Sequence, residues 1–127
     1  MIVLDASAAV LGLLNDGDAR RALMHEDVAI PHLADSEIAH ALRAQELRGD
    51  LDKAVAATAL SRWGRLGLRR FGASASLDRV WELRHNLSAY DATYVALAET
   101  LACTLVTADA RLARSPGPKC PITVLRR

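Results

Sequence analysis

Two acidic residues follow short apolar runs, an arrangement that delivers carboxylates to the edge of a sheet. Asp5 directly follows Ile2-Val3-Leu4, and Asp109 stands three residues after the end of Thr104-Leu105-Val106. Runs without a polar face are typical of strands buried on both sides of a sheet. Parallel neighbours end at the same edge, so we expect these two carboxylates to lie close together. A strand-end Asp is also a common turn or cap residue, and this alternative stays open for Asp5.

Two further acids lie in the first turns of predicted helices. Asp91 belongs to a predicted helix over 89–102, and Ser88 is placed to cap that helix. If the strand after this helix runs parallel to the first strand, the N-terminus of the helix lies at the edge where Asp5 and Asp109 are expected. Glu37 lies near the start of a helix over 33–48. Their alternative role is to complement the helix dipole, which contributes only about 0.3 to 1 kcal/mol.

Carboxylates that meet repel one another unless a proton or a cation lies among them. The chain has four His and two Cys, and neither Cys103 nor Cys120 belongs to a CxxC motif, so softer ligands do not cluster. Oxygen ligands alone suit Mg²⁺ or Mn²⁺. We therefore expect a site for one of these ions at the sheet edge.

Strands and helices alternate along the whole chain, and this order predicts how the acids are positioned. The pattern is typical of an α/β fold with a central parallel sheet of about four or five strands flanked by helices. The predicted strands cover 2–4, 28–30, 68–71, 104–106 and 122–124, and the predicted helices cover 8–14, 18–24, 33–48, 51–65, 76–86 and 89–102. Nothing in this order marks a linker or a repeat, so we expect a single domain over residues 1–127.

Several residues are predicted to begin or end these elements. Ser7 is a suitable N-cap for the first helix, and Asp50 for the helix that starts near residue 51. Pro31 is expected to stop the second strand. Asn86 is expected to adopt a left-handed conformation at the end of the helix that begins near residue 76.

Composition limits the class of protein. A chain of 127 residues with 51% hydrophobic residues can bury one core without disulfides. No apolar run is long enough to span a bilayer and no export signal is evident, so we expect a cytoplasmic protein without a membrane partner. The net charge is only +1, but 14 of the 16 basic residues are Arg, whose forked guanidinium suits phosphate or carboxylate partners. Genome composition can produce the same bias.

Four segments together resemble the PIN-domain ribonucleases, in particular the VapC toxins of bacterial toxin–antitoxin pairs. They are Leu4-Asp5-Ala6-Ser7, Asp35-Ser36-Glu37-Ile38-Ala39-His40-Ala41-Leu42, Ala89-Tyr90-Asp91-Ala92-Thr93-Tyr94-Val95-Ala96-Leu97-Ala98 and Thr107-Ala108-Asp109-Ala110-Arg111-Leu112. The resemblance implies a single PIN-like domain in which Asp5, Glu37, Asp91 and Asp109 form the catalytic metal site, with the hydroxyls of Ser7 and Thr107 close around it. Residues 49–76 carry no matching motif, so substrate choice cannot be inherited from the family.

The resemblance further implies a metal-dependent endoribonuclease that inhibits translation or growth and leaves 5′-phosphate and 3′-hydroxyl ends. A metal-bound water of lowered pKa suits such phosphodiester hydrolysis. Because an acidic pocket repels phosphate, Arg residues at its rim must attract the RNA, and the candidates are Arg43, Arg48 and Arg84. Each of them has a solvated helix face as its alternative role. Trp63 and Trp81 are expected to be core or dimer contacts more than base-stacking residues.

Two other functions are compatible with an Asp after the first strand. A phosphoryl-accepting α/β domain also places an Asp after its first strand, but neither Lys53 nor Lys119 stands where such a domain needs its lysine. A catalytically silent PIN-like module that binds RNA or a partner stays as the alternative. The resemblance implies a small VapB-type antitoxin whose tail places a basic side chain in the acidic pocket and lies in a groove between the first helix and residues 33–67. Homodimerisation through the Trp81 region is a separate expectation.

Overall fold

The central sheet is parallel throughout, with strand order β3-β2-β1-β4-β5. It is seen in a computed structural model that describes residues 1–126. The strands are β1 (Ile2–Leu4), β2 (Val28–Pro31), β3 (Arg69–Phe71), β4 (Thr104–Thr107) and β5 (Ile122–Val124). The predicted α/β class and parallel sheet are confirmed.

The register between β1 and β4 brings the ends of these two strands to one level. Leu4 pairs with Val106, and the backbone N–H of Asp5 donates to the carbonyl of Val106 at 3.0 Å. The residues that follow the two strands therefore leave the sheet side by side. This pairing explains why Asp5 and Thr107, 102 positions apart in the chain, become neighbours.

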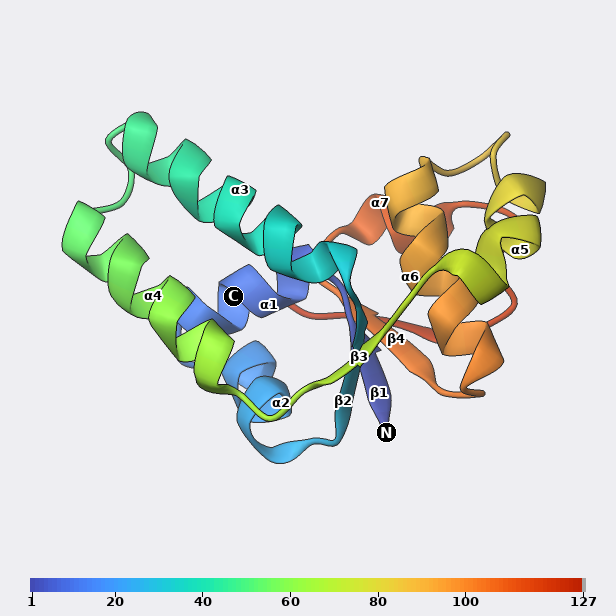
Figure 1. The fold of residues 1–127 in the computed structure, drawn as a ribbon, viewed down its shortest axis with the longest axis horizontal. Helices are drawn as coiled ribbons and strands as arrows, with labels where there is room; N and C mark the ends of the chain where they lie inside the picture. Colours follow the sequence, from blue (N-terminus) through green and yellow to red (C-terminus); the bar gives the residue numbers. More distant parts are fainter. Residues whose placement is uncertain (127) are drawn as a thin grey trace.

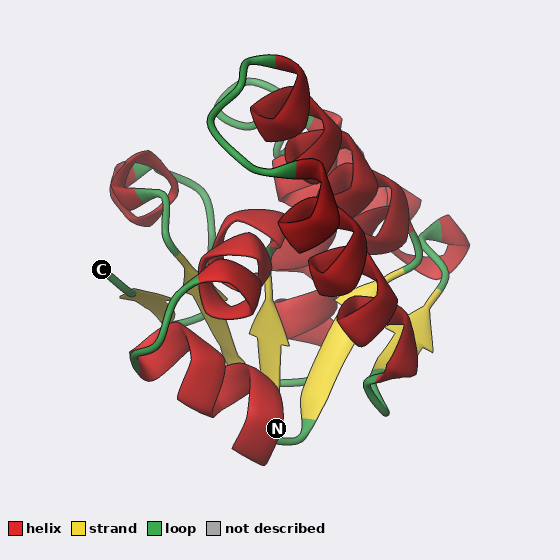
Figure 2. Ribbon diagram, turned by 90° about the vertical axis from the view of Figure 1, so that its left-hand side faces the viewer, coloured by secondary structure: helices red, strands yellow, loops and turns green. Residues whose placement is uncertain are grey.

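Helices cover both faces of the sheet. They are α1 (Ala6–Leu14), α2 (Asp18–His25), α3 (Leu33–Leu47), α4 (Lys53–Arg65), α5 (Leu77–Glu82), α6 (Ala89–Thr100) and α7 (Ala110–Arg114), with a short 3-10 turn, η1 (Ser74–Ser76), before α5. Figure 1 shows α1 to α4 on one side of the strands and α5 and α6 on the other. Figure 2 turns the first of these sides towards the viewer and shows its helices in front of the strands. None of the helices in residues 1–126 is long and apolar enough to span a bilayer.

Burial is complete in β2, whose four residues are all buried, and it is extensive in β1, β4 and α6. Val3, Leu4 and Leu105 have no exposed surface, and every residue of α6 from Ala92 to Ala98 is buried. A helix this apolar on all sides is expected where it packs across the middle of a sheet. Trp63 is 2% exposed, which confirms its core assignment, whereas Trp81 is 67% exposed on α5 and is not a core residue.

Two of the predicted caps are wrong. Asp5, not Ser7, is the N-cap of α1, because its side chain accepts a hydrogen bond from the backbone N–H of Ala8 at 3.0 Å. Ser7 lies inside the helix, and its hydroxyl bonds elsewhere. The helix expected from residue 51 begins at Lys53 after Asp52, since Asp50 forms an ion pair with Arg48 instead.

The second strand ends at Pro31 as predicted, one residue later than its expected range, whereas the conformation predicted for Asn86 is wrong. Pro31 is the last residue of β2 and pairs with Phe71 of β3. A proline is tolerated there because the paired residues of β1 and β2 extend only to Ala29, so β1 needs no N–H from it. Asn86 is not left-handed: apart from glycines, only Ala102 has a positive φ among the described residues, at 52°, just after α6.

Candidate acidic metal site at the carboxyl edge of the sheet

Asp5 is the most deeply buried acid of the site. Its side chain is tied down at both oxygens: Oδ1 accepts from the Ser7 hydroxyl at 2.6 Å and from the Ala8 N–H at 3.0 Å, and Oδ2 accepts from the Thr107 hydroxyl. The residue is 5% exposed. Asp5 therefore both caps α1 and presents a carboxylate at the sheet edge, so the two interpretations of this residue hold together.

Two hydroxyls join the ends of β1 and β4 around that carboxylate. Thr107 Oγ1 also accepts from the Asp109 N–H at 2.9 Å, and Ser7 Oγ accepts from the Ala108 N–H at 3.0 Å. The two hydroxyl oxygens lie 3.2 Å apart. The structure thus places Ser7 and Thr107 beside Asp5, where the family resemblance implies them.

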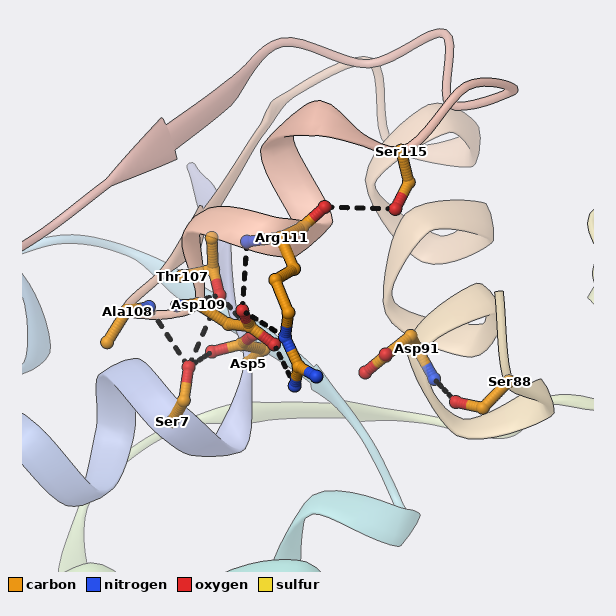
Figure 3. A network of polar contacts seen from close by, with 9 residues as sticks. All are labelled: Asp5, Ser7, Ser88, Asp91, Thr107, Ala108, Asp109, Arg111 and Ser115. Atoms are coloured by element: carbon orange, nitrogen blue, oxygen red, sulfur yellow. Dashed lines mark hydrogen bonds and ion pairs between the residues drawn. The ribbon is translucent and has the colours of Figure 1, made fainter. Parts of the chain in front are cut away.

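Asp109 caps the short helix α7 and is held by Arg111. Its carboxylate accepts from the backbone N–H of Arg111 at 2.9 Å and from the guanidinium Nε and Nη2 at 3.2 and 3.1 Å (Figure 3). This guanidinium lowers the pKa of Asp109 below its ordinary value. Asp109 is therefore the member of the site that is already paired with a cation.

Glu37 and Asp91 reach the site from α3 and α6. The backbone N–H of Asp91 donates to the Ser88 hydroxyl at 3.1 Å, which confirms Ser88 as the N-cap of α6. Glu37 Oε1 accepts from the hydroxyl of Tyr94 at 2.6 Å, and Tyr94 is 1% exposed. From the sequence alone, Tyr94 has no assigned role beyond its place in the segment 89–98. The role of Tyr94 could have been found from its place one helical turn after Asp91, because a buried Tyr needs a hydrogen-bond partner for its hydroxyl.

The four carboxylates interact electrostatically with one another. Burial raises the pKa of Asp5, Glu37 and Asp91, and the negative charges of the neighbouring acids raise each pKa further. The carboxylates of Asp5 and Asp109 both act on Asp91, and those of Asp91 and Asp5 act on Glu37. The Arg111 guanidinium offsets part of this negative charge, and a cation among the acids would relieve the remaining repulsion.

The acids share one edge, but they do not converge on one point. Among residues 1–126, no three His, Cys, Asp or Glu side chains are arranged closely enough to hold a metal ion. Glu37 points to Tyr94 and Asp109 to Arg111, while the oxygens of Asp5 are bonded to hydroxyls. The donors are all oxygen, as Mg²⁺ and Mn²⁺ prefer, and Glu37, Asp91 and Asp109 are partly exposed, so their side chains can rotate. The residues fit such an ion in chemistry and charge.

Two cavities open beside the acids. One of about 680 Å³ lies between α1 and α3, with Ser7, Glu37, His40 and Tyr90 in its wall. One of about 190 Å³ lies at the start of α6 and includes Ser88, Asp91, Asp109 and Arg111. The edge of the sheet is therefore open to a ligand on both sides of the acids.

The three Arg residues proposed at the rim lie apart from one another. Arg43 and Arg48 are exposed on or just after α3, and Arg48 pairs with Asp50. Arg84 lies over the ring of Trp81, a residue of α5, 4.6 Å from the ring centroid. Figure 1 shows α5 on the other face of the sheet from α3. Within residues 1–126 no hydrogen bond or ion pair joins any of these three to the four acids, whereas Arg111 contacts Asp109 directly. Their role in RNA binding stays a prediction.

Known proteins similar to this chain establish its family. The PIN domain family matches residues 2–117, so the chain belongs to the PIN domain family. Within it, the chain is 53% identical over 127 residues to Ribonuclease VapC9 of Mycobacterium tuberculosis (strain ATCC 25618 / H37Rv), covering 100% of both chains. The resemblance stated from the four sequence segments is confirmed.

Solved structures show the same fold. PAE2754 from Pyrobaculum aerophilum is 28% identical, with a TM-score of 0.70 over 95% of this chain and 81% of that one. A second solved structure is that of VapBC2 from Rickettsia felis bound to a DNA fragment from the VapBC2 promoter. One of its chains is 17% identical to this chain, with a TM-score of 0.71 over 99% of this chain and 100% of that one. The parallel sheet with helices on both faces is thus the fold of these proteins.

Proposed function

We propose that this protein is an Mg²⁺- or Mn²⁺-dependent endoribonuclease that hydrolyses RNA phosphodiester bonds, and that it is the toxin of a toxin–antitoxin pair. The observation that carries the proposal is full-length identity of 53% to a VapC ribonuclease, in a chain whose four acids lie near one edge of the sheet and act on one another electrostatically. PIN-domain VapC nucleases generally depend on a divalent metal ion.

Each residue of the site has a role in this proposal. Asp5, Glu37, Asp91 and Asp109 would hold the ion, which when bound supplies a water of lowered pKa and positive charge for the developing oxyanion. The hydroxyls of Ser7 and Thr107 keep the Asp5 carboxylate in one orientation. Tyr94 does the same for Glu37, and a fixed orientation reduces the reorganisation that the reaction requires.

The substrate would enter along the open edge. The cavity between α1 and α3 reaches Glu37, and the smaller one reaches Asp91 and Asp109, so an extended strand that follows both cavities passes these three acids. The expected products carry 5′-phosphate and 3′-hydroxyl ends. Cellular RNA fragments sequenced from their 5′ ends after induced expression would identify the cleavage site.

Asn variants test the enzyme assignment. Asp5→Asn and Asp91→Asn keep side-chain volume and remove charge, and each should lower cleavage of a susceptible RNA in Mg²⁺ or Mn²⁺ by about a hundredfold or more, because the ion loses a ligand. Asp16→Asn is a matched control, since the side chain of Asp16 is 95% exposed beyond the end of α1. Near-parental cleavage by Asp5→Asn or Asp91→Asn would refute the assignment.

One observation favours the alternative of a catalytically silent module that binds RNA or a partner. No three metal-binding side chains of residues 1–126 converge in the structure. Metal binding decides between the two functions: a nuclease takes up Mn²⁺ at this edge, and Asp109 is then released from Arg111, whereas Glu37 keeps its hydrogen bond to Tyr94 through Oε1. RNA binding without Mn²⁺ uptake or cleavage would favour the silent module.

The proposed restraint on the enzyme is a small VapB-type antitoxin. The cavity of about 680 Å³ between α1 and α3 offers Ala6, Val10 and Ala41 to an apolar tail, and it ends at Glu37, where a basic side chain would meet the acids. A complex with the product of the neighbouring gene should lose nuclease activity, and a tail without its basic residue should inhibit less. A tight complex that stays fully active would contradict this mechanism and leave the enzyme assignment standing.

Homodimerisation is part of the proposal through an exposed surface on α5. Leu77 and Trp81 are 57% and 67% exposed there, and exposed apolar side chains on one short helix favour a contact between copies. Replacing Trp81 by Ser should shift the protein towards monomer in sedimentation velocity measurements. An unchanged distribution of species would place the interface elsewhere.

A further inference from the structure

Arg111 places a guanidinium group among the acids of the site. Its Nε and Nη2 donate to the two different oxygens of Asp109, so both oxygens of that carboxylate are occupied. Figure 3 shows the guanidinium lying between Asp109 and Asp91, and its charge also acts on Asp91. A metal ion that used Asp109 would have to share its carboxylate with this guanidinium, and the two positive charges would repel each other.

The contact between the two side chains is poorly suited to holding the fold together. The Arg111 side chain is 84% exposed and that of Asp109 31% exposed, and ion pairs in contact with water contribute little stability. The start of α7 is secured separately by the backbone N–H of Arg111, which donates to Asp109 at 2.9 Å without the guanidinium. The Arg111 side chain is therefore free to exchange its partner.

We propose that Arg111 is an exchangeable counter-ion: it pairs with Asp109 in the metal-free protein and binds a phosphate of the RNA backbone once a metal ion occupies the acids. This inference rests on the proposed function. A divalent ion neutralises Asp109 and repels the guanidinium, which then stands at the rim with planar N–H donors that match phosphate oxygens. Arg111 is in this way both a competitor of the metal and a ligand of the substrate.

Two binding measurements on Arg111→Gln should change in opposite directions. In Mn²⁺ titrations followed by electron paramagnetic resonance, the variant should bind about three- to tenfold more tightly, because a positive charge near the ion is removed. In fluorescence anisotropy with labelled single-stranded RNA and Ca²⁺ as the divalent ion, it should bind less tightly. The slope of log K against log salt should become shallower by about 0.7, the value for one lost phosphate contact.

Two control variants make the result specific. Arg21→Gln removes the same charge from an exposed ion pair with Asp18 on α2, whose C-terminus leads into the amino end of β2 away from the acids, and it should change neither measurement. Arg111→Lys keeps the charge and loses the forked geometry, so its Mn²⁺ affinity should stay near parental while RNA binding weakens. Arg111→Lys also carries the test if Arg111→Gln does not fold.

Each outcome separates this inference from the proposed function. If Asp91→Asn loses Mn²⁺ binding, the metal site is where the proposed function puts it. Mn²⁺ binding by Arg111→Gln that is then unchanged or weaker would overturn the counter-ion role and leave the nuclease site intact. An unchanged salt dependence would overturn the phosphate contact. If the parental protein binds no Mn²⁺ and cleaves no RNA, the proposed function falls, and this inference falls with it.

Discussion

Replacing Tyr94 by Phe should reveal how strongly the buried hydroxyl supports the site. The change deletes one oxygen that donates to Glu37 Oε1 at 2.6 Å and leaves the ring in place. Tyr94 is 1% exposed, so water does not reach the ring and cannot take the place of the deleted hydroxyl. The perturbation is therefore confined to one hydrogen bond between α6 and α3.

The size of the effect follows from the charge and exposure of Glu37. A hydrogen bond to a charged group contributes about 1.5 to 3 kcal/mol, but Glu37 is only half-buried, and water can solvate its carboxylate in the variant. We expect the free energy of unfolding at pH 7 to fall by about 1 to 2 kcal/mol. For a chain of 127 residues this lowers the melting temperature by roughly 4 to 7 °C.

The loss should depend on pH in a direction that the pKa of Glu37 determines. Burial and the charges of Asp91 and Asp5 raise this pKa above 4.5, although the Tyr94 hydroxyl lowers it. Without the hydroxyl the pKa rises further, so the variant binds the Glu37 proton more readily in its folded state. The difference in stability between the two proteins is therefore complete above both folded-state pKa values and shrinks as the pH falls below them.

Urea denaturation and thermal melts at pH 7 and pH 4 measure both quantities. Tyr90→Phe is the matched control, because Tyr90 also lies in α6 but is 65% exposed. The melting temperature of this variant should equal that of the parental protein. A Tyr94→Phe melting temperature within 1 °C of parental at pH 7 would refute the hydrogen-bond argument. An equal loss at both pH values would show that packing, not the carboxylate, is responsible.

Three further outcomes are expected. Thr107→Val should lower the free energy of unfolding by about 1 to 3 kcal/mol in urea, because the buried Thr107 hydroxyl donates to Asp5 and accepts from the Asp109 N–H; a loss below about 0.5 kcal/mol would contradict this. The folded-state pKa of Asp91 is raised above 3.8, so the parental protein should lose stability relative to Asp91→Asn as the pH rises from about 4 to 7. If the free energies of unfolding of the two proteins instead change with pH in parallel, repulsion among the acids is not responsible. Excess EDTA should abolish cleavage and leave cooperative unfolding intact, since the buried apolar core does not involve the metal, and disappearance of the cooperative transition would make the ion structural.

The sequence by itself determined the order of the elements and the edge at which the acids lie. Apolar runs such as residues 2–4 and helical periodicity such as that of residues 89–102 are local patterns, and they specify strands and helices before any long-range contact forms. Parallel connectivity then places every strand's carboxyl end at one edge, which is why Asp5 and Asp109 could be expected together.

Local preference was a weaker guide wherever two residues compete for the same role. Ser7 and Asp50 are good capping residues, but Asp5 and Asp52 occupy the cap positions. Ser7 bonds to the far strand end instead, and Asp50 pairs with Arg48. Capping preferences among Ser, Asp and Asn differ by too little to predict the outcome once long-range partners are present.

Only the tertiary structure decided what each carboxylate contacts. Glu37 meets the Tyr94 hydroxyl across 57 positions of the chain, because α3 and α6 lie on opposite faces of the sheet and both begin at its carboxyl edge. Asp109 is paired with a guanidinium only two residues away, yet that group reaches Asp91 as well because α7 and α6 open at one edge. Contacts of this kind depend on strand register and helix packing, which set distances to within an ångström and are not encoded in any local pattern.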